Sequence, residues 1–366
     1  MLRLRSSALL CSIATGFASM TFAAALAQER AANPAAGPRV SIMERYPDRL
    51  QARIELRQRT LSTARPAGGF TPRSLVRLTK RWDAGQTVKV AFRGGDTRLH
   101  QDIATAVTEW TQYANLKFDF GVDPATGNYR RWSRSDTDFV ADIRVSFDQT
   151  GYYSLVGNDS INRTITRPGE ESLNLEGFDQ QKPSDWMAVA LHEFGHAIAF
   201  EHEHQSPIAP CDFRYNDDPG YVLTTDSFGQ YIKDPQNRRP GLYTYLGGPP
   251  NNWPRAVVDF NLNQLPDSHA YEVGPSFDKD SIMKYFFPDW MFVAGTNSQC
   301  YTGAENLALS DGDKQGAAKV YPRAPESVAS ASTLRTQALE AAAKIPGLPA
   351  TAQKHFQEEL NKAQKK

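Results

Sequence analysis

Residues 192–204 read His-Glu-Phe-Gly-His-Ala-Ile-Ala-Phe-Glu-His-Glu-His, and this stretch holds four of the seven histidines of the chain. His192 and His196 are four residues apart, so on a helix they lie on one face and both imidazoles can reach a metal ion at roughly 2.0–2.1 Å. Glu193 follows the first histidine directly and would stand beside the metal without binding it. The spacing predicts a zinc site on a helix, with Glu193 as a general base.

His202 is the candidate third ligand. A continuous helix turns by about 240° over the six residues after His196, so the chain has to change direction near Ala199 to bring His202 back. Three neutral histidines and one open position for water are the coordination that hydrolytic zinc sites use. Glu193 would take a proton from the zinc-bound water. A His-Glu-x-x-His pair also occurs by accident in helices without metal, and His202 is the residue that favours the zinc interpretation.

The segment resembles the metzincin zinc peptidases, whose pattern His-Glu-x-x-His-x-x-Gly-x-x-His is followed downstream by a Met-turn. Within that clan the chain is most similar to the astacins and their bacterial relatives, because Glu203 directly follows the third histidine. A stretch similar to the astacin Met-turn is Ser281-Ile282-Met283-Lys284-Tyr285. The stretch from Leu309 to Tyr321 also resembles the closing helix of the family, so the resemblance covers roughly residues 81–322.

The resemblance implies an α+β fold of the metzincin-like zincin type, with a mixed twisted sheet and helices above the cleft and an irregular lower subdomain that contains the Met-turn. It also implies that Met283 forms the apolar floor under the three imidazoles, although a methionine alone is more often an ordinary core residue. Tyr285 would be a switchable zinc ligand that stabilises the oxyanion.

Two features depart from the family pattern. Ala199 occupies the position of a glycine, in a turn that favours a positive φ and costs a residue with a Cβ about 1 kcal/mol. Met283 lies about 80 residues beyond His202, farther than in a compact astacin. The second departure implies an inserted segment between the metal ligands and the Met-turn.

Residues 1–27 predict a secretory signal peptide, because Arg3 and Arg5 precede a mostly apolar stretch that ends in Ala25-Leu26-Ala27. An uncleaved membrane anchor is the alternative. No other window holds the roughly eighteen apolar residues of a membrane span, so we expect export to the periplasm or the extracellular space. In an oxidising compartment Cys211 and Cys300 would form a disulfide; two buried thiols are the alternative.

The rest of the chain divides into a core and two extensions. Residues 28–80 are rich in Arg, Ala and Pro, and we expect a propeptide or a linker outside the core. Residues 81–322 would form the catalytic domain, and residues 323–366 a solvated helical extension. Lys plus Arg and Asp plus Glu both number 41, so the zero net charge does not favour a nucleic-acid partner.

Alternating residues predict strands at 87–92, 116–120 and 143–147, and Ile103, Val107 and Trp110 predict a core-facing helix. Residues 151–157 would be either the free edge of the sheet, which could bind an extended peptide, or a connecting loop. Ser184 is the expected N-cap of the zinc helix. A short helix is expected at residues 256–262.

The sequence therefore predicts a secreted zinc-dependent endopeptidase with one Zn²⁺ ion, held by His192, His196 and His202, and a protein or peptide substrate. His204 would make a surface contact or a contact behind the ligands. The alternative is a catalytically inert zinc-binding or adhesive secreted module. Glu193 argues against this alternative, because an inert module has no need of a general base.

Overall fold

The computed structural model describes residues 45–62, 69, 77–265 and 276–365, all of which belong to one unit, residues 41–366. The predicted signal peptide lies outside the described residues. No described helix is long and apolar enough to cross a membrane.

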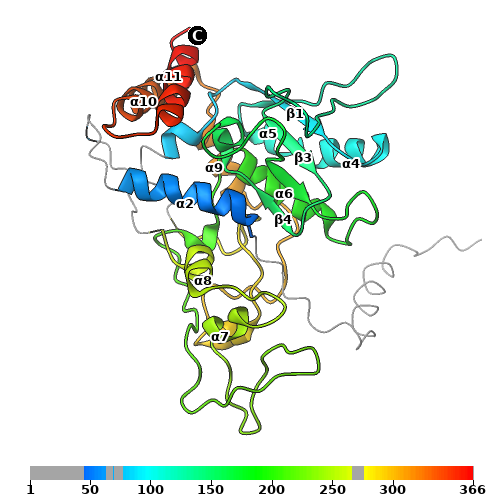
Figure 1. Ribbon diagram of the computed structural model, residues 1–366, viewed down its shortest axis with the longest axis vertical. Helices are drawn as coiled ribbons and strands as arrows, with labels where there is room; N and C mark the ends of the chain where they lie inside the picture. Colours follow the sequence, from blue (N-terminus) through cyan, green and yellow to red (C-terminus); the bar gives the residue numbers. More distant parts are fainter. Residues whose placement is uncertain (1–44, 63–68, 70–76, 266–275, 366) are drawn as a thin grey trace, which may run out of the picture. The chain divides into compact units, whose positions relative to one another are not determined.

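A five-stranded sheet carries the fold (Figure 1). Its strands, in spatial order, are β2 (Lys117–Asp119), β1 (Thr87–Phe92), β3 (Ile143–Ser146), β5 (Leu173–Leu175) and β4 (Tyr152–Ser154). The first four run parallel, and β4 runs antiparallel to β5 at the end of the sheet. The mixed sheet and the surrounding helices confirm the predicted α+β class, and the predicted edge segment is the terminal strand β4.

The helices fall into three regions of the chain. Before and within the sheet region they are α2 (Asp48–Ser62), α4 (Thr97–Val107), α5 (Trp110–Tyr113), the 3₁₀ helix η1 (Gly157–Ile161) and α6 (Trp186–Ala197). In the lower half they are η2 (Glu203–Gln205), α7 (Leu242–Gly247), α8 (Arg255–Leu262), η4 (Asp289–Met291) and η5 (Gly295–Asn297). The C-terminal helices are α9 (Asp311–Val320), α10 (Pro325–Ala343) and α11 (Ala350–Ala363).

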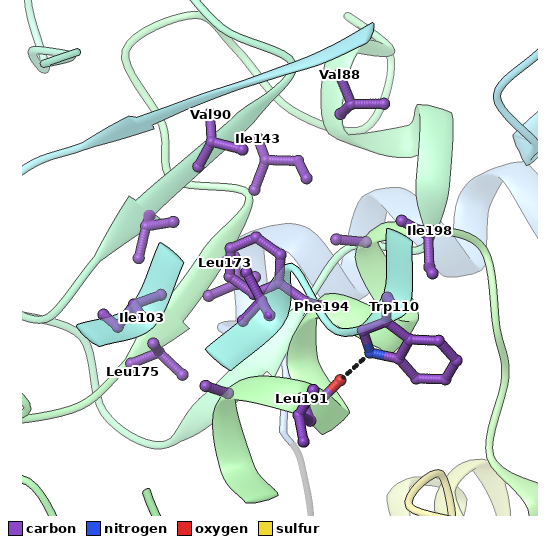
Figure 2. Close-up of a cluster of buried hydrophobic side chains, with 14 of the residues drawn as sticks. Val88, Val90, Ile103, Trp110, Ile143, Leu173, Leu175, Leu191, Phe194 and Ile198 are labelled. Carbon is purple, nitrogen blue, oxygen red and sulfur yellow. Dashed lines mark hydrogen bonds between the residues drawn. The ribbon is translucent and has the colours of Figure 1, made fainter. Parts of the chain in front are cut away.

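The main core lies between the sheet and helices α4 and α6. Val90 and Ile143, which are register partners on β1 and β3, pack with Phe194 of α6 and with Trp110 (Figure 2). The indole nitrogen of Trp110 donates to the carbonyl of Leu191 at 2.9 Å, which joins α5 to the zinc-motif helix. The core therefore fixes α6 against the sheet on the one hand and against α5 on the other.

Two terminal segments are more buried than the sequence indicates. Helix α2 buries Leu50 and Ile54 against Tyr153 and Leu155, so the expectation that residues 28–80 lie outside the core is wrong for this helix. Helices α10 and α11 pack together and bury Leu339 among their other apolar residues. The prediction that residues 323–366 form a solvated extension is therefore wrong, because α10 and α11 both contribute to an apolar cluster separate from the main core.

The zinc-motif helix begins one residue later than expected. Asp185, not Ser184, is the N-cap residue of α6, and no side chain caps the helix. The missing cap bond is offset by burial, because residues 188 and 190–197 of α6 are all buried.

Candidate metal centre

Helix α6 presents the first two histidines on its buried face. Its sequence is short of polar residues apart from the motif itself, and His192, Glu193 and His196 are all buried. Glu193 is 2% exposed, which is unusual for a carboxyl group without a functional reason. The helix therefore brings two imidazoles and one carboxyl group to the same interior site.

The chain reverses direction directly after α6, as the sequence predicts. Ala199 has φ +74°, the left-handed conformation that normally favours glycine. Its methyl group fits because Gly157 has no side chain: a Cβ on Gly157 would lie 2.9 Å from the Cβ of Ala199. This turn brings His202 back to the first two histidines.

The three histidines meet at their Nε2 atoms. Nε2 of His196 lies 3.2 Å from Nε2 of His192 and 3.1 Å from Nε2 of His202. Among the described residues they form the one group of three or more metal-type side chains with ligand atoms within 4.8 Å of one another.

Each of these imidazoles is oriented by an oxygen atom at its other nitrogen. Nδ1 of His192 lies 2.6 Å from the carbonyl oxygen of Ile282, and Nδ1 of His196 lies 2.7 Å from that of Phe200. Nδ1 of His202 lies 3.1 Å from the side-chain oxygen of Gln205. An oxygen acceptor at Nδ1 requires the proton there, so the three Nε2 lone pairs point inward.

This arrangement fits a zinc ion. Two nitrogen ligands that each lie 2.0–2.1 Å from a tetrahedral zinc ion are about 3.3 Å apart. The Nε2 atom of His196 lies 3.2 and 3.1 Å from the other two Nε2 atoms, which is close to that value. Three neutral imidazoles with their lone pairs converging have no hydrogen-bond donor between them, so without a cation they would repel one another. The donor set is the one that zinc prefers in hydrolytic sites.

The Met-turn lies directly beneath the site. Met283 is buried, and its carbonyl accepts from the N–H of Glu203 at 2.9 Å, which ties the third-histidine loop to the turn. Asp313, at the start of α9, holds the turn from below: it accepts from the hydroxyl of Ser281 at 2.6 Å and from the N–H of Ile282 at 2.8 Å. The Ile282 carbonyl that orients His192 is thereby fixed.

Tyr285 lies among the imidazoles. Its ring centroid is 4.4 Å from that of His202 and 5.3 Å from that of His192. His204 lies behind His202, is fully buried, and its Nε2 is 2.9 Å from the carbonyl oxygen of Asn261. Burial, aided by the neighbouring His202, lowers the pKa of His204 well below its usual value. His204 therefore contacts the ligand residue from behind and is not part of the three-histidine group.

Glu203 is a partly buried acid near the site. It accepts from the N–H of Asp278 at 3.0 Å. Burial raises the pKa of Glu203 to about 7, with smaller contributions from the charges of Asp278 and Asp313. Its backbone and its carboxyl group thus join the third-histidine loop to the segment that leads into the Met-turn.

Two supporting residues were not predicted from the sequence. Gln205 orients His202 and in turn donates to the carbonyls of Phe260 and Asn263, at the end of α8. Asp313 has a sequence signal, because Ser310 and Asp313 form a capping box for α9. Gln205 has none, because its partners lie 55 and 58 residues away.

A disulfide joins Cys211 to Cys300 across 89 residues of sequence. It links the segment after the third histidine to the segment after the Met-turn. The isolated bridge between Phe213 and Phe292 lies near it and joins the same two segments. The lower half is therefore closed covalently.

No protein family profile matches the chain, and no curated protein matches it. Solved structures do. One structure of myroilysin is 27% identical, covers 67% of this chain and 97% of its own, and has a TM-score of 0.49; a second is 24% identical, covers 79% and 97%, and has a TM-score of 0.41.

A third match is high choriolytic enzyme 1, a hatching enzyme zinc-protease from the medaka fish Oryzias latipes. It is 17% identical, covers 66% of this chain and 94% of its own, and has a TM-score of 0.37. These TM-scores are modest, so the function has to be inferred from the residues of the site. The chain is similar to astacin-like metalloproteases, as its motifs predict.

Proposed function

We propose that the chain is a secreted zinc-dependent endopeptidase that hydrolyses peptide bonds with a metal-activated water and a glutamate general base. One observation carries the proposal: three Nε2 atoms converge while each Nδ1 lies against an oxygen acceptor. Such an arrangement supplies zinc with three neutral ligands and leaves further coordination positions open.

In this proposal His192, His196 and His202 hold one Zn²⁺ ion, which when bound polarises the scissile carbonyl and lowers the pKa of a water molecule towards about 7. Glu193 takes the proton of the attacking water and passes it to the leaving amine. Tyr285 donates a hydrogen bond to the oxyanion. Met283 supports the imidazoles from below and takes no part in proton transfer.

We also propose that residues 1–27 are a signal peptide and that residues 81–322 form the catalytic domain. The disulfide between Cys211 and Cys300 supports export, because such bonds persist in oxidising compartments. A protein or peptide is the expected substrate, since β4 is the terminal strand of the sheet and such a strand can align an extended chain.

Casein cleavage tests the proposal. The purified chain should cleave casein, lose that activity to a chelator, and recover it when zinc is added. Glu193→Ala should retain stoichiometric zinc and lose hydrolysis by several orders of magnitude. A zinc-loaded chain that leaves casein intact would favour the inert zinc-binding or adhesive module, and near-normal hydrolysis by Glu193→Ala would exclude Glu193 as the base.

A further inference from the structure

The turn that carries the third histidine is held by contacts from outside it. Helix α6 ends at Ala197, and the chain then reverses to bring His202 back. The last carbonyl groups of a helix have no partner within the helix. Here the indole nitrogen of Trp82 donates to the carbonyl of Ala197 at 2.9 Å. The hydroxyl of Tyr321 donates to the carbonyl of Ile198 at 2.8 Å. Both bonds are buried, so two distant parts of the chain fix the start of the turn.

The indole belongs to residues 80–83, which precede β1 and which we call the entry segment. At its start, the ammonium group of Lys80 donates to the carboxylate of Glu201 at 3.1 Å, and Glu201 directly precedes the third ligand. A Cβ built on Gly157 would overlap the backbone carbonyl of Lys80, so the entry segment also contacts the glycine that makes room for the turn. Lys80 pairs in addition with Asp159 of η1 at 3.6 Å. The entry segment therefore contacts both ends of the turn and the 3₁₀ helix beside it.

Helix α10 holds the entry segment through one buried arginine. Nε of Arg335 donates to the carbonyl of Arg81 at 2.8 Å, and Nη1 donates to the carboxylate of Asp83 at 2.8 Å. Nη2 donates to Glu359 of α11 at 3.1 Å. The two acceptors on the entry segment lie on either side of Trp82. Because a guanidinium is a rigid planar fork, these bonds fix the backbone around the indole relative to α10.

Helix α11 holds η1 through the same carboxylate. Glu359 accepts from the side-chain amide of Asn158 at 2.8 Å, and both residues are buried. Asn158 directly follows Gly157, which packs against the turn. The other oxygen of Glu359 accepts from Lys362 at 2.6 Å. The two C-terminal helices, which pack against each other, thus reach the turn by two routes, one through the entry segment and one through η1 (Figure 1).

We infer that α10 and α11 position the third metal ligand: Arg335 holds the entry segment, Glu359 holds η1, and these two segments hold the turn that presents His202. Neither Arg335 nor Glu359 is one of the three ligands, so both are positioning residues. The inference goes beyond the proposed function, whose catalytic domain ends at residue 322. It rests on that function only in taking His202 as a zinc ligand.

A turn that moves lowers zinc affinity because fewer molecules have the third ligand in place before the metal binds. The apparent affinity falls by the fraction of molecules in the competent conformation. If loss of one contact leaves the turn correctly placed in a tenth to a third of the molecules, zinc affinity falls by about 3–10-fold. A purely structural role of the C-terminal helices would lower the melting temperature and leave the zinc affinity of the folded chain unchanged.

Zinc affinity of the full chain, measured by competition with a chromophoric chelator at a temperature where every variant is folded, tests the inference. Trp82→Phe removes the bond to Ala197 and keeps an aromatic ring in the core. Arg335→Lys keeps a positive charge beside Glu359 and Asp83 but cannot supply the three-way fork. The two changes lie at successive steps of one route to the turn.

Each variant has a matched control. Trp132→Phe also removes a bond from a buried indole, but that indole donates to the carbonyl of Val145 on β3 at 2.7 Å and not to the turn. Leu339→Ala lies one helical turn beyond Arg335 and opens a cavity in the apolar cluster of α10 and α11. It lowers stability without removing any bond of Arg335.

Trp82→Phe and Arg335→Lys should each lower zinc affinity by about 3–10-fold. In the metal-free chain, both should speed the amide hydrogen exchange of Ala199 and Phe200, which donate to carbonyls at the end of α6. The two controls should have lower melting temperatures with the zinc affinity and exchange of the parent. The double variant Trp82→Phe/Arg335→Lys should lose little more affinity than the weaker-binding single variant, because both changes act on the same route.

Unchanged zinc affinity in Arg335→Lys would overturn the inference, even if Trp82→Phe binds zinc more weakly, because the turn would then be held without the C-terminal helices. An equal loss in Leu339→Ala would overturn it too, since affinity would then follow stability alone. Fully additive losses in the double variant would show that the two residues act separately, with the same consequence. A parent chain that binds no zinc would count against the proposed function, and the exchange of the metal-free variants would still decide whether α10 holds the turn.

Discussion

Gly195 of the zinc-motif helix lies directly over Met283 of the Met-turn. A Cβ built on Gly195 would come closer to the sulfur of Met283 than real Cβ contacts do, and would lie a tight 3.1 Å from its methyl carbon. The helix can rest on the turn only because residue 195 has no side chain. Gly195 lies three residues after His192 and directly before His196, so this contact sets the height of both ligands above the turn.

Gly195→Ala should therefore destabilise the fold by about 1–3 kcal/mol, the usual cost of overpacking a filled core, and should weaken zinc binding. Thermal denaturation and a competitive zinc titration measure the two effects. Gly316→Ala is the control, because an added Cβ there meets only ordinary contact at 3.5 Å and should stabilise α9 by about 0.5–1 kcal/mol. An equal effect of both variants would contradict the packing argument.

Gln205 should matter for the metal although it does not bind it. Gln205→Leu removes the acceptor at Nδ1 of His202 and leaves the carbonyls of Phe260 and Asn263 without their donor. We expect a loss of about 10–100-fold in zinc affinity, the usual effect of removing a residue that orients a ligand. Competition with a chromophoric chelator measures it. Gln264→Leu, an exposed neighbour, should leave zinc affinity unchanged.

The site was predictable where its residues are contiguous. His192, His196 and His202 lie within one short stretch, and helix geometry alone demands the turn that Ala199 makes at φ +74°. The orienting oxygens were not predictable. The carbonyl of Ile282 becomes a partner of His192 only when the Met-turn folds beneath α6, which no local pattern encodes.

The fold, too, was predictable where the sequence pattern is local and not where distant segments meet. Strand β1 was predicted from alternation, with the same bounds, Thr87–Phe92. Strand β5 was missed because its three residues are too few to show a period. The spacing of Arg49, Arg53 and Arg57 is visible in the sequence, but their acidic partners lie more than 100 residues further on. Docking of α2 therefore needed the structure.

Tyr285→Phe separates a role in oxyanion stabilisation from a role in packing. The ring packs against both His192 and His202, and phenylalanine keeps those ring contacts while removing the hydroxyl. We expect kcat to fall by about 10²–10³-fold, with zinc content and melting temperature unchanged. Steady-state kinetics with elemental analysis decide the point. A change in KM alone would assign the hydroxyl to substrate binding instead.

The disulfide should be a main support of the lower half. In the chain-entropy account, a cross-link over 89 residues stabilises the fold by about 4–5 kcal/mol. Cys211→Ser/Cys300→Ser should lose most of this, and dithiothreitol should lower the melting temperature of the native chain but not that of the double variant. A loss below about 1 kcal/mol would mean that the contact between Phe213 and Phe292 suffices to close this region.

Glu359 should make the stability of the chain depend on acid pH. This residue of α11 is buried, and its carboxylate binds Asn158 at 2.8 Å and Arg335 at 3.1 Å. Burial opposes its ionisation, but its bond with Lys362 and the charges of Lys362 and Arg335 outweigh this and lower the pKa of Glu359 from 4.5 to about 2. Because the folded pKa is the lower one, the stabilisation is complete above about pH 4.5 and is lost as the pH falls towards 2.

The shift corresponds to a stabilisation on the order of 3 kcal/mol at neutral pH, which Glu359→Gln should remove. Free energies of unfolding, measured from pH 7 down to the acid limit of folding, should differ most between the native chain and the variant near neutrality. The two should converge as the pH falls through the window above. Glu358→Gln is the control. The side chain of Glu358 is 52% exposed, and its ion pair with Lys354 is long at 3.8 Å and contributes little. The stability of this variant should therefore follow the native curve. A constant difference at every pH would mean that Glu359 acts through packing, and that α11 is not held by its charge.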